Sequence, residues 1–150
     1  MTVADNTTMT KFGYPGTLVA ETARWVALVR PQQVTLGSLV LVSTEPARAF
    51  GGLSAQAFVE LGAMVGAAEA TLHGLFAYDK INYMMLMMVD PDVHFHVFPR
   101  YAAERTFAGT TFRDPFWPRP PDPTKPLELA DTVVPALAKA LRRAWPGANG

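Results

Sequence analysis

The clearest periodic pattern in the chain is an apolar stripe between residues 54 and 76. It recurs at intervals of three and four positions, at Phe58, Leu61, Val65, Ala68, Leu72 and Leu75. This spacing places the side chains on one face of an α-helix. The Ser54 hydroxyl can cap the first turn by accepting a backbone hydrogen bond. The pattern therefore predicts a helix over Ser54 to Phe76, with His73 off the stripe as an ordinary surface residue.

Shorter apolar runs on either side of this helix predict β-strands. Before it, runs at residues 18–19, 25–29 and 39–42 are separated by polar connections, as in an antiparallel meander. After it, the run Ile81 to Val89 is apolar on both faces and predicts a central strand. A turn at Asp90 and Pro91 pairs this strand with residues 93–98 as a hairpin. The pairing brings Met85 and Met87 near the histidine face. The methionines Met84, Met85, Met87 and Met88 can line an adaptable pocket, but filling the core is their favoured role.

The two ends of the chain carry weaker patterns. Residues 1–15 are small, polar and aperiodic, which predicts a flexible N-terminus ahead of a single domain over residues 16–150. The segment from Tyr101 to Lys125 is rich in proline and aromatic residues and predicts an ordered loop that wraps the surface. Asp131 can cap a last helix, which buries Leu137, Leu141 and Trp145 and ends at Pro146 and Gly147.

These elements predict an α+β fold: an antiparallel sheet of about five strands with a central helix and a C-terminal helix. The chain has 150 residues, of which 49% are hydrophobic, so it has room for one domain with a substantial core.

Composition narrows the classes of partner. Thirteen basic and thirteen acidic residues cancel, which argues against nucleic acid or an anionic membrane as the main partner. The absence of cysteine excludes a thiolate nucleophile and a cysteine metal cluster. The N-terminus lacks a basic region followed by an apolar run, and the longest apolar run is too short to cross a bilayer. We therefore expect a cytoplasmic protein that recognises any anion locally.

Groups capable of chemistry gather in the segment Val89 to Arg100, which reads V-D-P-D-V-H-F-H-V-F-P-R. Successive side chains of a strand point to opposite faces. One face therefore carries Asp92, His94 and His96, and the other carries Val93, Phe95 and Val97. Like-facing neighbours lie roughly 7 Å apart, so one phosphate-sized group can span the two imidazoles. The pattern predicts a strand with a core on one side and a site on the other.

Other interpretations of this segment stay open. The two histidines can be solvated or internally satisfied residues of a half-exposed strand. A metal site is a second interpretation, because Asp90, Asp92, His94 and His96 offer imidazoles and carboxylates suited to zinc or iron. Neighbours on one strand face rarely converge on one ion without a ligand from elsewhere, so we expect no metal. Arg100 can bind phosphate or cap the following loop, and Asn82 is read as a structural hydrogen-bonding residue.

The motif V-H-F-H-V-F-P-R resembles that of the histidine-triad superfamily, in which three histidines alternate along a strand. The segment R-W-V-A-L-V-R-P-Q-Q-V-T-L-G-S-L-V-L resembles the nucleotide-cradling hairpin of that family. The likeness runs from about Thr17 to Tyr101 and is nearest to bacterial hydrolases of the diadenosine tetraphosphate type. It implies a homodimeric nucleotide hydrolase or transferase with no cofactor.

The resemblance also implies roles for individual residues. His94 falls at the nucleophile that forms a nucleotidyl-histidine intermediate, and His96 is the third histidine. A neutral imidazole is a competent nucleophile near neutral pH. Leu28 and Val40 fall at positions that contact the base, and Arg30 at the position that contacts the ribose. Arg30 replaces the short acidic or amide residue that is usual there.

Two further departures bear on activity. Asp92 replaces the first histidine, and Val-Asp-Pro replaces a glycine-rich loop that contacts phosphate. The Asp92 carboxylate can fix the tautomer of His94, hold an imidazolium, or repel phosphate. Three hypotheses follow: a working hydrolase or transferase, a catalytically impaired nucleotide-binding protein, and a small metal-binding protein that uses Asp92, His94 and His96.

Overall fold

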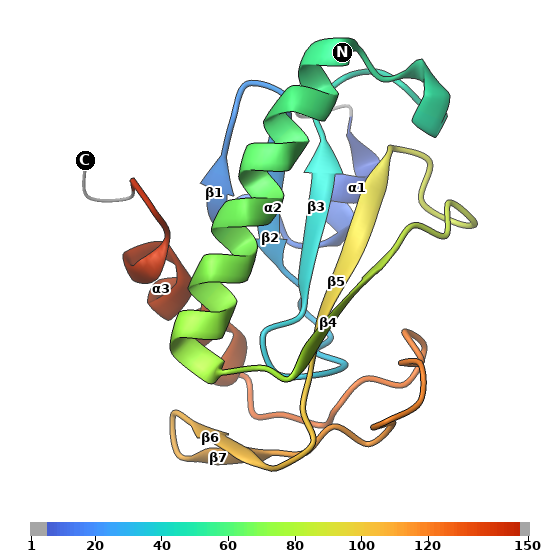
Figure 1. The fold of residues 1–150 in the computed structure, drawn as a ribbon. Helices are drawn as coiled ribbons and strands as arrows, with labels where there is room; N and C mark the ends of the chain where they lie inside the picture. The colour runs from blue at the N-terminus through green and yellow to red at the C-terminus, as the bar shows by residue number, and fades with distance from the viewer. Residues whose placement is uncertain (1–5, 148–150) are drawn as a thin grey trace.

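The computed structural model describes residues 6–147 (Figure 1). In chain order the helices and strands are α1 (Thr7–Lys11), β1 (Leu18–Glu21), β2 (Trp25–Val29), β3 (Leu39–Ser43), the 3-10 turn η2 (Phe50–Gly52), α2 (Ala55–Phe76), β4 (Lys80–Met84), β5 (His94–Arg100), β6 (Arg105–Phe107), β7 (Thr110–Phe112) and α3 (Val133–Ala144). No helix in this described part is long and apolar enough to cross a membrane.

One antiparallel sheet organises these elements. Its strand order is β1-β2-β3-β5-β4, so the predicted five-stranded α+β fold is confirmed. Helices α2 and α3 cover one face, and α1 lies against the opposite face (Figure 1). The large core lies between the sheet and α2 and α3, and a smaller apolar cluster lies under α1. The sheet therefore separates the main core from the face that carries the histidines.

Helix α2 begins as predicted but is rotated relative to the apolar stripe. The Ser54 hydroxyl accepts a hydrogen bond from the Ala57 amide at 3.1 Å, which confirms the cap. The buried face centres on Ala57, Met64, Ala68, Thr71, Leu72 and Phe76, whereas Phe58 and Leu75 are exposed. Small alanines let the helix approach the sheet closely, and the Trp25 indole donates to the Ala57 carbonyl at 2.7 Å. Close approach decided the rotation more than hydrophobicity did.

A glycine before β3 permits this close packing. Gly37 adopts φ +83°, a conformation that L side chains rarely take. A Cβ at this position would lie 2.9 Å from the Leu72 side chain. The turn that leads into β3 therefore requires glycine both for its backbone and for the contact with α2.

The strand after α2 is shorter than predicted, and it lies at the edge of the sheet instead of its centre. The predicted central strand Ile81 to Val89 is wrong: β4 ends at Met84 and forms the edge of the sheet. Its antiparallel pairing with β5 is confirmed, with Met84 opposite His96. Beyond Met84 the chain leaves the sheet, and Met88 and Val89 are 85% and 81% exposed. An edge strand and its loop need no buried side chains on both faces, so the apolar run was a misleading signal.

The N-terminal prediction is also wrong for residues 6–15, which are ordered. The Asn6 side chain accepts a hydrogen bond from the Met9 amide at 2.9 Å and so caps α1. Met9 and Phe12 are buried against β2 and β3. The sequence pattern did not indicate this packing, because only these two apolar side chains stand within a polar stretch. Residues 1–5 of the predicted flexible segment lie outside the described residues.

The segment from Tyr101 to Lys125, predicted as a loop, runs past the end of the sheet and includes a β6–β7 hairpin that the sequence pattern did not indicate (Figure 1). The predicted cap at Asp131 is wrong, because α3 has Thr132 at its N-cap and no side-chain hydrogen bond there. Burial of Leu137, Leu141 and Trp145 is confirmed.

Arg100 and Asp114 fasten the proline-rich loop to the end of β5. The Arg100 Nε donates to Asp114 at 2.7 Å, and both side chains are almost fully buried. The same carboxylate also accepts from the backbone amides of Tyr101, Phe116 and Trp117. Removal of one member of a buried ion pair leaves an uncompensated charge.

We therefore predict that Asp114→Ala lowers the free energy of unfolding by about 3–5 kcal/mol. Urea unfolding followed by tryptophan fluorescence measures this loss. Asp122→Ala is the matched control, because Asp122 lies in the same loop and holds only Thr124 and Lys125. Equal losses in the two variants would contradict the anchoring role of Asp114.

Candidate active site

His94 and His96 share one face of β5, and both are buried, with 2% and 6% exposure. Their ring centroids lie 5.1 Å apart and the rings are nearly perpendicular. The neighbouring Val93 and Val97 point into the main core on the other face. Because β5 lies between β3 and β4, the strand cannot slip or turn without breaking pairs on both sides. The predicted alternation therefore places both imidazoles firmly on the site face.

The His94 ring is oriented by its own strand. Its Nδ1 lies 2.7 Å from the backbone carbonyl oxygen of Asp92. A carbonyl only accepts hydrogen bonds, so Nδ1 carries the proton and Nε2 keeps its lone pair. This tautomer is the one that leaves Nε2 able to act as a nucleophile or a base.

His96 is held in its neutral form. Burial lowers its pKa to about 4, and the positive charge of Arg30 and the neighbouring His94 act in the same direction. Its ring stacks on Phe98 and meets the ring of Phe12 edge-on at 5.7 Å. Within the described residues its Nδ1 has no hydrogen-bond partner. A neutral imidazole with an unused nitrogen is thus available beside His94.

Arg30 brings a positive charge to the same place. It follows β2, and its guanidinium donates to the carbonyls of Gln32 and Pro123 and lies 5.8 Å above the Phe98 ring. Its Nε is buried and finds no partner among the described residues. Burial lowers its pKa, although the nearby Asp90 opposes this. Arg30 therefore offers one unused donor next to the histidines.

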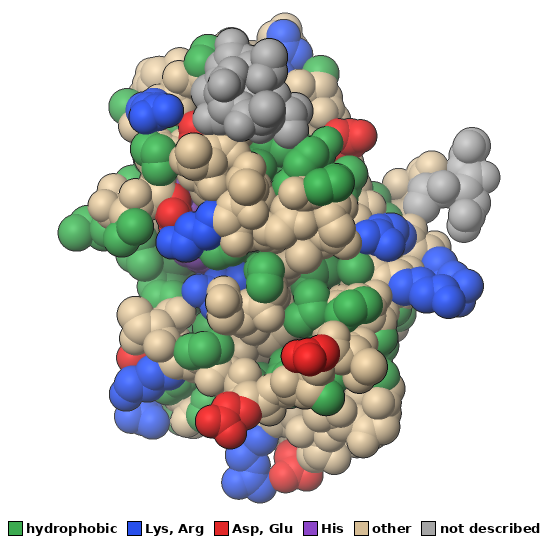
Figure 2. Space-filling view, turned by 180° about the vertical axis from the view of Figure 1, so that it is seen from behind, with side chains coloured by type: hydrophobic (Ala, Val, Ile, Leu, Met, Phe, Trp, Pro, Cys, Tyr) green, Lys and Arg blue, Asp and Glu red, His purple; other side chains and the backbone are tan. Residues whose placement is uncertain are grey.

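These groups line a pocket of about 390 Å³. Seen from behind, histidine forms a small recessed patch bordered by basic and apolar side chains (Figure 2). Besides the two histidines and Arg30, the pocket is lined by Lys11, Phe12, Gln32, Leu86, Met87, Met88, Val89, Asp90, Pro123, Thr124 and Pro126. The walls thus come from α1, the loop before β5 and the proline-rich loop.

Sequence reasoning missed the contribution of α1. Lys11 lies at the pocket and donates to Asp90 at 2.9 Å, and Phe12 contacts both histidine rings. The signal that could have revealed it is the capping residue Asn6 followed by apolar Met9 and Phe12 at helical spacing.

Three of the predicted binding residues do not line the pocket. Leu28 and Val40 are fully buried beneath Met9 and Phe12, so they form the floor on which α1 lies. Arg100 is directed to Asp114, Asn82 and the Arg119 carbonyl, and none of its described contacts reaches the histidines. Of the two interpretations of Arg100, the geometry supports the loop anchor. The same contact gives Asn82 the structural role that was expected of it.

Asp92 is fully buried, but within the described residues its carboxylate forms no hydrogen bond with either histidine ring, and its Oδ1 has no partner. Its Oδ2 accepts a hydrogen bond from the Thr8 amide at 3.2 Å. The His94 tautomer therefore depends on the Asp92 backbone and not on its side chain. No three acidic or histidine side chains within residues 6–147 come together in a geometry that could hold a metal ion, which weakens the metal-site interpretation.

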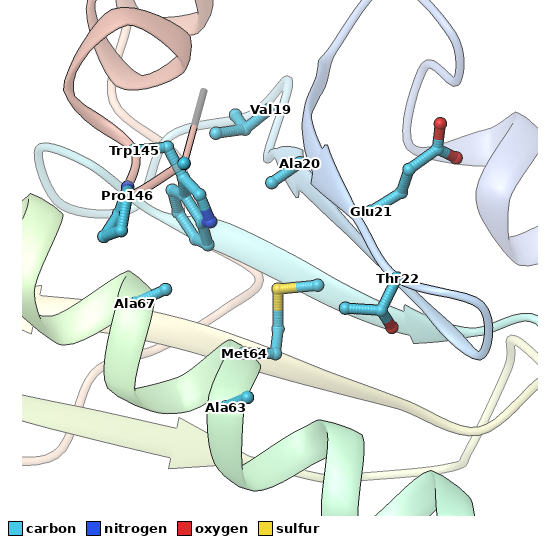
Figure 3. Close-up of a pocket in the computed structure, with 10 residues that line it drawn as sticks. Val19, Ala20, Glu21, Thr22, Ala63, Met64, Ala67, Trp145 and Pro146 are labelled. Carbon is cyan, nitrogen blue, oxygen red and sulfur yellow. The ribbon is translucent and has the colours of Figure 1, made fainter. Parts of the chain in front are cut away.

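A second hollow lies on the other side of the sheet, between β1, α2 and the end of α3. It has a volume of about 420 Å³, and its lining includes Met64 and Trp145 (Figure 3). Glu21 supplies its only charged side chain, and its described lining includes no imidazole. It lacks the groups that phosphoryl-transfer chemistry needs.

Solved structures share this architecture. A histidine triad protein from Sinorhizobium meliloti matches with a TM-score of 0.71 at 16% identity, covering 92% of this chain and 93% of that protein. One from Bradyrhizobium japonicum gives 0.68 at 23% identity, with 85% and 89% coverage. The chain has the histidine-triad fold. A diadenosine triphosphate hydrolase from Plasmodium falciparum shares that fold with a TM-score of 0.57 at 11% identity, covering 86% of this chain and 76% of that one. No family model matches the sequence, and no curated protein does.

The lowered pKa of His96 predicts a pH dependence of stability. In the unfolded chain the His96 imidazole takes up a proton near pH 6.5, whereas in the folded protein it does so only near pH 4. Its contribution is therefore complete above pH 6.5 and is lost as the pH falls from 6.5 through 4, with a slope of up to about 1.4 kcal/mol per pH unit. Urea unfolding across this range measures the slope. In His96→Gln the slope should be smaller, because the unfolded and folded states then differ by up to one proton less. Equal slopes in the native protein and in His96→Gln would contradict the assignment.

Proposed function

We propose that the protein is a nucleotide phosphohydrolase or nucleotidyl transferase that acts through a nucleotidyl-histidine intermediate on His94. The observation that carries the proposal is the Nδ1 contact of His94 with the Asp92 carbonyl, which leaves Nε2 free beside the pocket. The histidine-triad fold supports it, since one protein with that fold is a diadenosine triphosphate hydrolase.

The reaction takes two displacements at phosphorus. In the first, the His94 Nε2 forms a bond to phosphorus while the bond from phosphorus to the leaving-group oxygen breaks. Bound phosphate raises the pKa of a neighbouring imidazole because it favours the cation, so His96 can give a proton to that oxygen. In the second, water or another hydroxyl acceptor gives its proton to His96 and attacks phosphorus, the nitrogen–phosphorus bond breaks, and His94 is regenerated.

Local charge supports recognition of phosphate in a chain without net charge. Arg30 and Lys11 both line the pocket, and the unused Nε of Arg30 can donate to a phosphate oxygen. Asp90 neutralises part of the charge on Lys11. The pocket is therefore suited to a small phosphate ester and not to an extended polyanion.

A protein that binds nucleotide without turnover is the second candidate. It is favoured by Asp92, which replaces an imidazole with a carboxylate beside the reacting face, and by the acidic Asp90 in the pocket lining. Negative charge at these positions repels the charge that the phosphate oxygens carry in the transition state and so slows transfer, which leaves a protein that binds nucleotide without turnover. Turnover measurements separate the two candidates.

We predict that His94→Ala lowers turnover by at least about a thousandfold, because it removes the nucleophile. The substrates to test are dinucleoside polyphosphates, nucleoside phosphoramidates and nucleotide sugars, followed by chromatography of the products. Mass spectrometry of the acid-quenched native protein should detect the adduct on His94. The control is His73→Ala, since His73 is exposed on α2. Unchanged turnover in His94→Ala would refute the mechanism, and nucleotide binding without turnover would favour the second candidate.

We also propose a homodimer with an isologous interface. The edge strand β4 leaves one row of backbone groups unpaired within the sheet, and the loop after it exposes Leu86, Met88 and Val89. Light scattering at micromolar concentration should give about twice the chain mass of 16.3 kDa. The mass of a single chain would contradict the dimer.

A further inference from the structure

Asp92 makes an unusual pair of contacts for a buried carboxylate. The Thr8 amide donates to its Oδ2, and the Asp92 amide donates in return to the Thr8 hydroxyl, both at 3.2 Å. Both residues are completely buried, and 84 positions separate them in the sequence. No basic side chain of the described residues forms an ion pair with Asp92. The described hydrogen bond of the carboxylate therefore runs to the backbone of α1 through Oδ2, whereas Oδ1 is buried and has no hydrogen-bond partner among the described residues.

Helix α1 needs such contacts to keep its place. It has five residues, which is too short to be stable by itself in water. Besides Asp92, it is held by Asn6, which donates to the Ser43 carbonyl at 2.9 Å, and by the exposed pair of Lys11 with Asp90. An exposed ion pair contributes little. The buried contacts at Asp92 and Asn6 are thus the principal polar links between α1 and the sheet.

The position of α1 decides how the histidines meet solvent. Phe12 follows α1 directly, and its ring lies 6.3 Å from that of His94 and 5.7 Å from that of His96. Phe12 and Lys11 also form one side of the pocket. The helix lies on the face of the sheet opposite α2 (Figure 1). Without it, the pocket would lose this wall and His96 would be open to water.

We propose that Asp92 is a positioning residue, which holds Thr8 and so fixes α1 with Phe12 and Lys11 as the wall of the substrate pocket. In this role the side chain acts as a hydrogen-bond acceptor for the Thr8 amide. It does not act by its charge on either imidazole, since its contacts run to α1. The role in substrate binding rests on the function proposed above, whereas the docking of α1 can be tested without any substrate.

Three substitutions separate an acceptor from a charge. Asp92→Asn keeps an oxygen that can accept from the Thr8 amide but removes the charge. Asp92→Ala removes both. Phe12→Ala removes the wall itself and leaves Asp92 in place. Glu60→Ala is the control for an acidic side chain that forms an ion pair away from this pocket, since Glu60 lies on α2 across the sheet and pairs with Arg24.

The readout is the pKa of His96, measured by NMR from the imidazole proton shifts of the purified proteins. The groups that face His96 are Arg30 after β2, His94 on β5, Asp90 in the preceding loop and Lys11 on α1, and burial outweighs all of them. In Asp92→Ala and Phe12→Ala we expect the pKa of His96 to rise from about 4 toward 6.5, because water reaches the ring. In Asp92→Asn and Glu60→Ala it should stay near 4.

A double variant tests whether the two residues act together. Asp92→Ala combined with Phe12→Ala should shift His96 no further than either change alone. With substrate, Asp92→Ala should raise KM about tenfold and change kcat less, because it loosens a binding wall and leaves His94 oriented by the backbone. If Asp92→Ala does not fold, Asp92→Leu, which fills a similar volume without an acceptor, takes its place and should raise the pKa of His96 in the same way.

Two results would overturn the proposal. One is a pKa of His96 that stays near 4 in Asp92→Ala or in Phe12→Ala. The other is an Asp92→Asn variant in which that pKa rises as far as in Phe12→Ala. Loss of a negative charge alone would lower an imidazole pKa, so such a rise would mean that a neutral acceptor at position 92 does not hold α1. Failure of the proposed reaction has a different signature: His94→Ala would retain turnover while the shifts of His96 follow the expectations above.

Discussion

Pairing of β5 with β3 on one side and β4 on the other holds the site in place. Side chains alternate along this strand, so the pairing that buries Val93 and Val97 in the main core also directs His94 and His96 to the opposite face. A slip of one residue would move the imidazoles into the core and expose the valines. Stability and site geometry thus depend on the same register.

Burial on the site face gives the two histidines different properties. His94 is fixed in one tautomer by a backbone carbonyl, whereas His96 is kept neutral by desolvation and by the positive charge of Arg30. Neither property needs a large net charge on the protein, which has thirteen basic and thirteen acidic residues. The pocket instead has two individual cations that can bind a phosphate: Arg30, which follows β2, and Lys11, which lies on α1.

The parts that sequence reasoning predicted are those set by local pattern. The two-residue alternation around His94 and the three-to-four-residue spacing before Leu72 depend on near neighbours, and both elements formed. The missed parts depend on distant contacts. The contact that docks α1 joins Thr8 to a residue 84 positions away, and the apolar run after Tyr83 left the sheet because β4 is an edge strand. One sequence by itself does not show which distant residues form a pair, so it predicts neither feature.

Replacement of the first histidine by Asp92 therefore does not by itself decide whether the site works. The group that orients His94 is the backbone carbonyl at position 92, which any residue supplies. The side chain there lies buried next to α1 and must find a hydrogen-bond donor, which the Thr8 amide provides. Only Oδ2 has this partner, whereas Oδ1 is buried without one among the described residues. Asp92 does not line the pocket, so its negative charge opposes phosphate less than its place in the sequence suggests. The chain can keep the orientation of His94 while the side chain at position 92 holds α1 as one side of the pocket.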